Sequence, residues 1–298
     1  MSSKKTRIII DTDIGDDADD ALALAFAARS PEVEIVGVTT VFCNTVARAK
    51  IAKQLLNLLG KGDIPVYAGM GKPLINEADT VTLPKQFMKD MEDIPIPQTS
   101  ALDFLYTHFM ASGGTDVLVP IGPLTNIALL IQLYPEVKQK IGSIVLMGGS
   151  FYRHYNEWNI FCDPEAASIV FASGIPIKAI GLDVTLQTPV TEELFQEIRL
   201  HNTPMTDLLG ELLNRFHSVH THHTFLHDPM AVLAVFDEEL LTYHSEDIVV
   251  ELKGEFTRGT TFARTAIGKR SAEKGILCAQ TIKSDVFVEL FRKRILGL

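Results

Sequence analysis

The chain has 298 residues, of which 46% are hydrophobic and 21% charged, a balance typical of a globular protein with a large core. Its formal net charge is −10 and it has no basic cluster, which argues against a nucleic-acid partner. No apolar run reaches the length of a membrane span, and the short isoleucine run near the N-terminus is too brief for a signal peptide, so we expect no membrane partner and a cytoplasmic location. The cysteines are far apart and form no CxxC motif, which indicates neither a zinc site nor a disulfide framework.

Strand-like and helix-like segments alternate along the chain. Apolar runs predict strands at residues 8–10, 33–41, 64–67, 116–120, 144–147, 177–182, 248–251, 260–265 and 276–281. Helices are predicted at residues 21–26, 44–59, 101–111, 124–133, 163–172 and 284–295, and residues 191–236 are mostly helical. Strands separated by helices imply βαβ units, so we expect an α/β fold in which a mostly parallel central sheet is flanked by helices, as a single domain over residues 1–298. Residues 69–98 are irregular, and a loop of that length is usually functional or mobile.

The loop after the first predicted strand is dense in carboxylates. Its six aspartates fall within ten positions: Asp11, Asp13, Asp16, Asp17, Asp19 and Asp20. Side chains this close repel one another unless a cation binds several of them, and oxygen ligands suit Ca²⁺ or Mg²⁺. Helix capping and the helix dipole explain one or two of these residues, but not Asp11 and Asp13, which lie just beyond an apolar strand. We therefore expect a metal site here.

Further polar groups follow the other predicted strands. Asn44 follows the second strand, Ile121 and Gly122 follow the strand at 116–120, and Met147 is followed by two glycines. Because the loops after parallel strands lie along one edge of a sheet, we expect these groups to meet at a ligand-binding edge.

A second acidic position, Asp228, lies between His227 and Pro229. Asp followed by Pro is typical of an ordinary helix start, and we interpret Asp163 and Pro164 in that way. Around Asp228, however, five of the nine histidines fall within eleven residues: His217, His220, His222, His223 and His227. Histidine moves protons near neutral pH, which favours a functional role. Zinc is the alternative for such a cluster, but the aspartate loop favours a hard ion.

The segment that contains Glu157 and Asn159 lies in the loop before residue 163. If this segment is extended, the two side chains point to the same side and suit the hydroxyl groups of a ligand. A solvated loop is the alternative.

Several of these motifs together resemble one known family. They are IIIDTDIG followed by DDALAL, then VTTVFCN, LVPIGPLTNIAL, VLMGGS, EWNIFCDPEAA and HDPMAV, and they span residues 8–232. The chain is similar to the nucleoside hydrolases, the inosine-uridine-preferring nucleoside N-ribohydrolases. The resemblance implies a Rossmann-like open sheet and hydrolysis of the N-glycosidic bond of purine or pyrimidine ribonucleosides to ribose and free base. It also implies one tightly bound Ca²⁺ and a homodimer or homotetramer.

The resemblance also implies roles for individual residues. Asp13 resembles the residue that binds calcium and accepts a proton from the attacking water, and Asp20 resembles the bidentate ligand. The implied metal ligands are Asp13, Asp20, Asp228 and the main-chain carbonyl of Ile121. The implied substrate contacts are Asp19, Asn44, Met147, Glu157, Asn159 and, beside the leaving base, His227. We expect His227 to be the acid for the leaving group, with His220, His222 and His223 as the alternatives.

The chain departs from the family pattern in two places. Asp16 and Asp17 are inserted between the glycine and the Asp-Asp pair. Alignment from the helix side makes Asp19 and Asp20 the functional pair, whereas alignment from the strand side would make Asp17 a ligand; we prefer the first because DDALAL continues into a helix. In addition, residues 76–98 contain no histidine, so the sequence gives no support for a purine-directed contact from this loop.

Two other functions fit part of the pattern. A haloacid-dehalogenase-like phosphotransferase also has an apolar strand followed by Asp-x-Asp, with the first carboxylate as nucleophile, but it does not need LTNIAL, EWN or HDP. A calcium-dependent nucleoside-binding protein without turnover is the other alternative, if the inserted aspartates displace the water. The base preference stays open.

Overall fold

The computed structural model describes residues 5–153, 155–218, 224–265, 268 and 275–298. The strands are β1 (Thr6–Thr12), β2 (Val33–Thr40), β3 (Val66–Ala68), β4 (Val117–Pro120), β5 (Ser143–Met147), β6 (Ile177–Ile180), β7 (Leu241–Glu246), β8 (Ile248–Val250), β9 (Thr261–Ala263) and β10 (Ile276–Ile282). The α-helices are α1 (Asp19–Arg29), α2 (Thr45–Leu58), α3 (Ala101–Ala111), α4 (Thr125–Leu133), α5 (Trp158–Cys162), α6 (Pro164–Phe171), α7 (Leu182–Thr185), α8 (Glu192–Leu200), α9 (Pro204–His217), α10 (His227–Phe236) and α11 (Ser284–Leu296). Short 3₁₀ helices span Lys89–Met91 and Pro135–Gln139.

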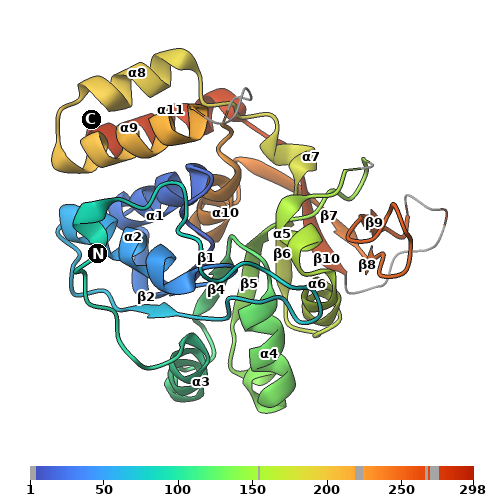
Figure 1. The fold of residues 1–298 in the computed structure, drawn as a ribbon. Coiled ribbons are helices and arrows are strands. Elements are labelled where there is room, and N and C mark those ends of the chain that lie inside the picture. The colour runs from blue at the N-terminus through green and yellow to red at the C-terminus, as the bar shows by residue number, and fades with distance from the viewer. Residues whose placement is uncertain (1–4, 154, 219–223, 266–267, 269–274) are drawn as a thin grey trace.

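Eight strands form the central sheet, in the order β3-β2-β1-β4-β5-β6-β10-β7 (Figure 1). All neighbouring strands are parallel except β7, which runs antiparallel to β10. The prediction of a mostly parallel sheet flanked by helices is therefore confirmed. The chain order reverses at β1, which lies between β2 and β4.

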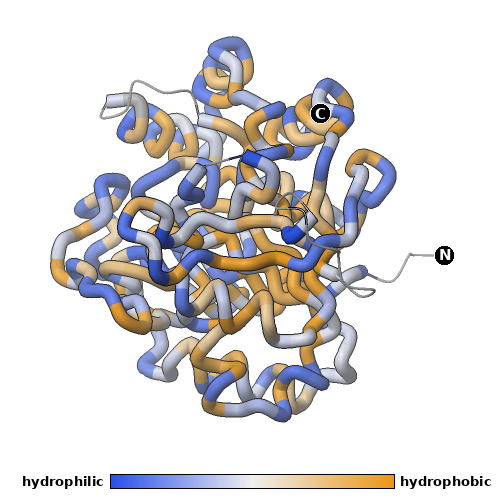
Figure 2. The backbone as a smooth tube through the Cα atoms, turned by 90° about the vertical axis from the view of Figure 1, so that its right-hand side faces the viewer, coloured by the Kyte–Doolittle hydropathy of each residue, from blue (hydrophilic) through white to orange (hydrophobic). Residues whose placement is uncertain are grey.

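Helices cover both faces of this sheet, and β1 shows why its sequence is apolar throughout. Ile8 and Ile10 join a core formed with α1, α2 and α8 to α11, whereas Ile9 faces the other core, formed with α3, α4 and α6. All three side chains are fully buried, as expected for a parallel strand covered on both faces. In Figure 2 the central strands are mostly hydrophobic, and hydrophilic segments are frequent in the outer loops.

Helix α1 packs in the larger core, and Phe26 near its C-terminal end contacts three other aromatic rings. The ring of Phe26 lies 6.0 Å from Phe236, 6.1 Å from Phe287 and 5.5 Å from Phe291. Residues 19–27 of this helix are all buried. Because truncation of a buried phenylalanine typically costs about 3–5 kcal/mol, α1 is a rigid support for the aspartates in its first turn.

The structure differs from the predicted elements in four places. Strand β7 was missed because its sequence, LTYHSE, is largely polar and half exposed. The predicted strand at 177–182 ends at Ile180, because Gly181 begins the short helix α7 and Leu182 N donates to the Gly149 carbonyl over 2.8 Å. Strands β8 and β9 were predicted, but they form a separate antiparallel pair. Helix α5 lies within the segment that was interpreted as a loop before residue 163. Among the described helices, none combines the length and apolar character that a membrane span requires.

Candidate active site

The carboxyl ends of the parallel strands meet at one edge of the sheet (Figure 1), and most of the predicted site residues follow these strand ends in the chain. The order of strands reverses between β1 and β4, which is where open α/β sheets bind ligands. Backbone hydrogen bonds continue beyond the strand ends: Ile121 N donates to Asp11 O over 2.7 Å, and Val41 N donates to Thr12 O over 3.0 Å. The loops that follow β1, β2 and β4 are therefore held side by side.

Three aspartates bring carboxylate oxygens within 4.8 Å of one another: Asp19, Asp20 and Asp228. Asp19 and Asp20 begin α1, Asp228 lies in the first turn of α10, and these two helices pack together. The three residues are only 5%, 4% and 3% exposed. In the described part of the chain, no lysine or arginine forms an ion pair with any of them.

Burial, together with repulsion between neighbouring carboxylates, raises the pKa of Asp19, Asp20 and Asp228 well above its usual range. A hydroxyl hydrogen bond from Thr12 to Asp20 opposes the rise in part. Buried oxygens in such a cluster fit a hard divalent cation, because its charge would favour the ionised carboxylates. The residues present therefore fit a metal ion.

Asp228 does not cap its helix, although the Asp-Pro pattern is typical of a cap. Helix α10 begins at His227 and its N-cap is Leu226, so Asp228 already lies inside the first turn. At Asp163, in contrast, the ordinary capping interpretation is correct: its carboxylate accepts from Ala166 N over 3.1 Å. The same sequence pattern thus has two different uses in this chain.

Asp13 lies beside the carboxylate group but outside the set defined by the 4.8 Å separation. A Cβ atom placed on Gly122 would come within 2.8 Å of Asp13 Oδ1, so the glycine after Ile121 leaves room for this carboxylate. Burial raises the pKa of Asp13 to about 7, while the positive charge of Arg48 acts in the opposite direction. The carboxylate thus lies next to Gly122, the residue that follows Ile121 after β4.

Asp11 is fully buried, and it braces the ends of three elements. Its Oδ1 accepts from Thr39 Oγ1 over 2.5 Å and from Asn126 Nδ2 over 2.7 Å. Asn126 also donates to Thr40 O over 3.0 Å and accepts from Met70 N over 2.9 Å. Burial raises the pKa of Asp11 to about 7. Asp11 therefore holds β1 against β2 and α4, and this explains the asparagine of the LTNIAL motif.

Asn44 caps α2 at the end of the β2 loop. Its Oδ1 accepts from Ala47 N over 3.1 Å, and its Nδ2 donates to Val81 O over 3.0 Å. The two residues before it, Phe42 and Cys43, have left-handed φ values of 66° and 59°. The loop therefore turns sharply just before Asn44, and it places this residue at the same edge as the aspartates.

Glu157 is held by backbone donors rather than by an extended segment. Its carboxylate accepts from Gly149 N over 3.0 Å, from Asn159 N over 2.8 Å and from Ile160 N over 3.0 Å, and it caps α5. The condition considered for residues 157–159, an extended segment, is not met, because the carboxylate folds back onto the first turn of a helix. Burial raises the pKa of Glu157, while these backbone donors oppose the rise.

Asn159 connects two other predicted residues. Its Nδ2 donates to the carbonyl of Ile121 over 3.1 Å and to the carbonyl of Met147 over 3.3 Å. The ends of β4 and β5 are thereby joined to α5. Three residues that are far apart in the sequence are in direct contact here.

His227 is partly buried at the start of α10. Its Nδ1 is hydrogen-bonded to Thr185 Oγ1 over 2.7 Å, and its ring lies 5.3 Å from that of Phe225. Burial lowers the pKa of His227 to about 4, so the imidazole is uncharged near neutral pH. The alternative acids His220, His222 and His223 lie outside the described residues, and the side chain of His217 is not described either.

Sequence reasoning gave no role to Arg48, Thr12, Thr185 or Asn126, all of which contact predicted site residues. Thr12 and Thr185 carry no pattern that separates them from other buried threonines. Arg48 carries a signal that could have been used. Arg48 precedes Ile51, Ala52 and Leu55 by three, four and seven residues, which places it on the apolar face of α2. In the structure it is 1% exposed.

Comparison with known proteins identifies relatives along the whole chain. A family model described as inosine-uridine preferring nucleoside hydrolase matches residues 8–289. The "Probable uridine nucleosidase 2" of Arabidopsis thaliana is 34% identical, and the match covers 98% of each chain. The "Pyrimidine-specific ribonucleoside hydrolase RihA" of Shewanella woodyi is 38% identical over 85% of this chain and 86% of that protein.

Solved structures agree with these relatives. A structure titled "Plant nucleoside hydrolase - PpNRh1 enzyme" superimposes with a TM-score of 0.88 at 27% identity, over 99% of this chain and 100% of that one. A purine-preferring ribonucleoside hydrolase from Gardnerella vaginalis gives a TM-score of 0.84 at 32% identity, over 98% of both chains. The match extends over nearly the full length, and the buried acidic group fits the metal dependence of these enzymes. The chain belongs to the inosine-uridine preferring nucleoside hydrolase family, and it is an enzyme that hydrolyses ribonucleosides to ribose and free base.

Proposed function

We propose that this hydrolase uses one Ca²⁺ held by Asp13, Asp20, Asp228 and the main-chain carbonyl of Ile121. The observation that carries the proposal is the buried group of Asp19, Asp20 and Asp228, which includes the pair chosen by the helix-side alignment and not Asp17. Calcium accepts six to eight oxygen ligands in flexible geometry, which suits carboxylates and a carbonyl contributed by four separate segments. When bound, the cation would supply positive charge and orient the attacking water.

Asp13 is the proposed base. It lies at the end of β1 beside Gly122, where it would accept a proton from the attacking water, and burial raises its pKa toward neutrality. A bound cation would favour the ionised form of this carboxylate, which is the form that accepts the proton.

Ribose would be bound by the groups gathered at the same edge. The proposed contacts are Asp19, Asn44, Met147, Glu157 and Asn159. As the base departs, the ribose develops oxocarbenium character, and buried carboxylates on Asp19 and Glu157 would stabilise its positive charge. The backbone donors around Glu157 hold its carboxylate in one orientation, so it needs little reorganisation during the reaction.

His227 is the proposed partner of the leaving base. Its Nδ1 is engaged by Thr185, which leaves Nε2 for a contact with substrate. Because the ring is uncharged near neutral pH, we propose that Nε2–H stabilises the leaving base by a hydrogen bond. This requires the tautomer in which Thr185 Oγ1–H donates to Nδ1, because a hydroxyl that accepted from Nδ1–H would leave Nε2 without a proton.

The base preference is proposed from the relatives. Proteins named for uridine and for pyrimidine ribonucleosides are 34% and 38% identical to this chain, which makes uridine the first substrate to assay. A purine-preferring relative is 32% identical, so inosine belongs in the same panel. The two alternatives raised from the sequence, the phosphotransferase and the binding protein without turnover, are set aside because the family and its hydrolase activity are shown.

The proposal is tested by metal analysis together with sugar release. We expect one Ca²⁺ per chain and release of ribose from uridine, and we expect 2′-deoxyuridine to react far more slowly because the polar groups that bind the 2′-hydroxyl are left unpaired. Zinc instead of calcium, or full activity without metal, would refute the metal assignment. Equal rates for uridine and 2′-deoxyuridine would refute the ribose contacts.

Assembly and location remain predictions. We propose a homodimer or homotetramer without a nucleic-acid partner, and a cytoplasmic location, on the resemblance and on the net charge of −10. Light scattering of the purified protein would measure the size of the assembly.

A further inference from the structure

Arg48 is a buried arginine for which neither the metal site nor the ribose contacts account. It lies on α2 with an exposure of 1%. Burial of a charged group is costly unless hydrogen bonds and an opposite charge compensate for it. The partners of this guanidinium therefore indicate its purpose.

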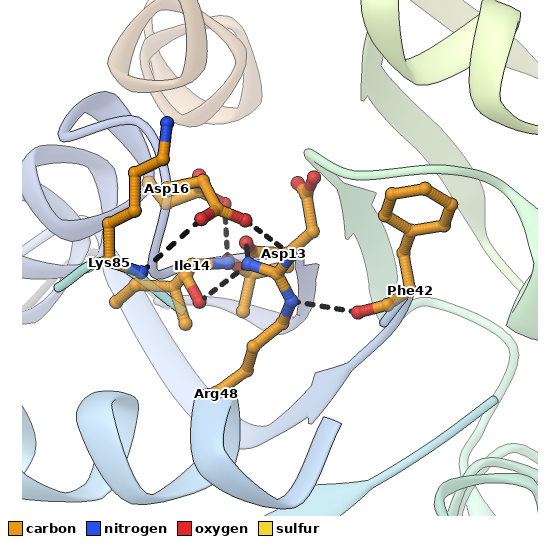
Figure 3. Close-up of polar contacts among 8 residues, drawn as sticks. Asp13, Ile14, Asp16, Phe42, Arg48 and Lys85 are labelled. Atoms are coloured by element: carbon orange, nitrogen blue, oxygen red, sulfur yellow. Dashed lines mark hydrogen bonds and ion pairs between the residues drawn. The ribbon is translucent and has the colours of Figure 1, made fainter. Parts of the chain in front are cut away.

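The guanidinium contacts the loop that carries the proposed base. Nη1 donates to the main-chain carbonyl of Asp13 and, over 3.0 Å, to that of Ile14 (Figure 3). Nη2 forms an ion pair with Asp16 at 2.8 Å. Arg48 thus binds the main chain of Asp13, the residue whose carboxylate is proposed to accept the proton.

The same guanidinium contacts the loop that carries Asn44. Its Nε donates to the carbonyl of Phe42 over 2.7 Å, and Figure 3 shows the guanidinium between Phe42 and the Asp13–Asp16 loop. Phe42 and Cys43 both adopt left-handed φ values, which cost energy in residues other than glycine. The hydrogen bond from Nε therefore helps to keep a strained turn in the conformation that presents Asn44.

Asp16 belongs to the inserted pair, and its contacts explain what the insertion does. One carboxylate oxygen binds Arg48, and the other accepts from Lys85 N at 3.4 Å. Gln86 N also donates to Gly15 O over 2.9 Å. The insertion thus supplies a counter-charge to Arg48 and attaches residues 84–86 to the aspartate loop.

We propose that Arg48, paired with Asp16, is a positioning residue for nucleoside hydrolysis: it fixes the Asp13 loop and the Asn44 turn relative to each other. This inference rests on the roles proposed for Asp13 and Asn44. A planar guanidinium reaches three carbonyls and a carboxylate at once, whereas the compact ammonium of lysine cannot span them. The positive charge alone is therefore not sufficient for this role.

The test uses Arg48→Lys, Arg48→Ala and Asp16→Asn, with Arg292→Ala as the matched control. Arg292 also binds a carboxylate, that of Glu197, but it joins α11 to α8, and neither residue is assigned to the site. For Arg48→Ala we expect kcat on uridine to fall about 10²-fold, the effect of a displacement of about 1 Å in a catalytic group. Arg48→Lys should lose more than about 10-fold, and Asp16→Asn less than Arg48→Lys, because the carbonyl contacts remain. Arg292→Ala should keep kcat.

Chemical rescue separates positioning from general stability. Free guanidinium should restore part of kcat to Arg48→Ala and leave Arg292→Ala unchanged, and metal analysis should find Ca²⁺ retained in Arg48→Lys. The proposal is overturned if Arg48→Lys keeps kcat within about threefold of the unaltered enzyme, or if guanidinium fails to restore activity to a folded Arg48→Ala. Should Arg48→Ala not fold, Arg48→Lys and Asp16→Asn decide. A fully active Asp13→Asn enzyme would instead overturn the base assignment and leave the Arg48 series to be judged by its own rescue.

Discussion

Buried aspartates lie near both ends of β1 and β4, but their charges are compensated differently at the two ends. At the amino end, Asp116 is 2% exposed, and its carboxylate contacts Arg7 at 3.3 Å and His108 at 2.7 Å. At the carboxyl end, Asp19, Asp20 and Asp228 lie within 4.8 Å of one another, and no ion pair compensates them within the described residues. An aspartate charge is thus compensated at the amino end, whereas the aspartates at the carboxyl end repel one another.

This difference separates a structural carboxylate from a functional one. A paired buried carboxylate stabilises the native state when its charge and lone pairs are satisfied. An unpaired group of three costs free energy, and such a group persists where a ligand supplies the missing charge. The local excess of negative charge at the carboxyl end is therefore the better marker of the active site.

A cavity by itself does not identify the active site. A cavity of about 430 Å³ lies at the amino end, lined in part by Tyr67, Phe104 and His108, with the two aromatic rings stacked at 4.4 Å. The buried acid beside it, Asp116, already has its partners. The size of a cavity thus carries less information here than the balance of charge.

The largest effect is expected from a substitution within the group of uncompensated aspartates at the carboxyl end. Asp20→Ala should abolish tight Ca²⁺ binding and hydrolysis, because it removes a central carboxylate of the group. Asp17→Ala is the matched control from the same loop, and it should keep the metal. Calorimetric titration of Ca²⁺ measures both. Metal loss from Asp17→Ala with retention by Asp20→Ala would show that the strand-side alignment is correct.

The sequence was sufficient to predict the sheet and much of its edge. The apolar run of β1 and the carboxylates after it carried most of the information, because a buried parallel strand and a cluster of like charges each leave few alternatives. The expected parallel sheet also predicted that Asn44 and Ile121 lie at one edge, and they follow β2 and β4 at that edge, although their roles stay proposals.

What the sequence could not predict depends on contacts between distant segments. The fold-back of Glu157 onto Gly149 requires α5, whose five residues give too little periodicity to detect. Strand β7 has a polar sequence and is ordered by its pairing with β10. The purpose of Asp16 became visible only when Arg48, 32 positions away, was placed beside it. Local sequence patterns do not predict contacts between residues that are so far apart in the chain.

The next effect concerns His227, whose partly buried ring is uncharged near neutral pH. His227→Ala should slow uridine cleavage by about 10²-fold, which is typical for loss of one donor to a developing negative charge. It should slow p-nitrophenyl riboside much less, because nitrophenolate departs without help. Steady-state rates on both substrates measure the difference. Equal losses on both would place the leaving-group donor elsewhere and leave His227 a packing role.

A smaller effect should appear in the pH dependence of stability without metal. Burial raises the pKa of Asp11 and of Asp13 from 3.8 to about 7, so between these values the folded state keeps protons that the unfolded state has released. The free energy of unfolding of chelator-treated protein should therefore fall as pH rises from about 4 to about 7. Urea titrations across this range measure the slope. Asp13→Asn should flatten it, and bound Ca²⁺ should also flatten it because the carboxylates are then ionised in the folded state. A slope unchanged in Asp13→Asn would contradict the assignment.

The smallest effect is a change in the free energy of unfolding after replacement of one aspartate by asparagine. We expect this change to have opposite signs at the two ends. Asp116→Asn removes a charge that Arg7 compensates and alters the hydrogen bond with His108, so it should lower the free energy of unfolding by about 1–3 kcal/mol. Asp228→Asn removes a charge that only repels its neighbours, and no described donor forms a hydrogen bond with its carboxylate. In metal-free protein at neutral pH this second substitution should therefore raise the free energy of unfolding, by about 1 kcal/mol or more, at the expense of activity. Urea denaturation of the two variants, each compared with chelator-treated unaltered protein, measures both signs, and Asp116→Asn should keep kcat on uridine when Ca²⁺ is restored. Destabilisation by both substitutions would mean that the carboxyl-end aspartates have compensating partners of their own, and the charge contrast between the two ends would no longer mark the site.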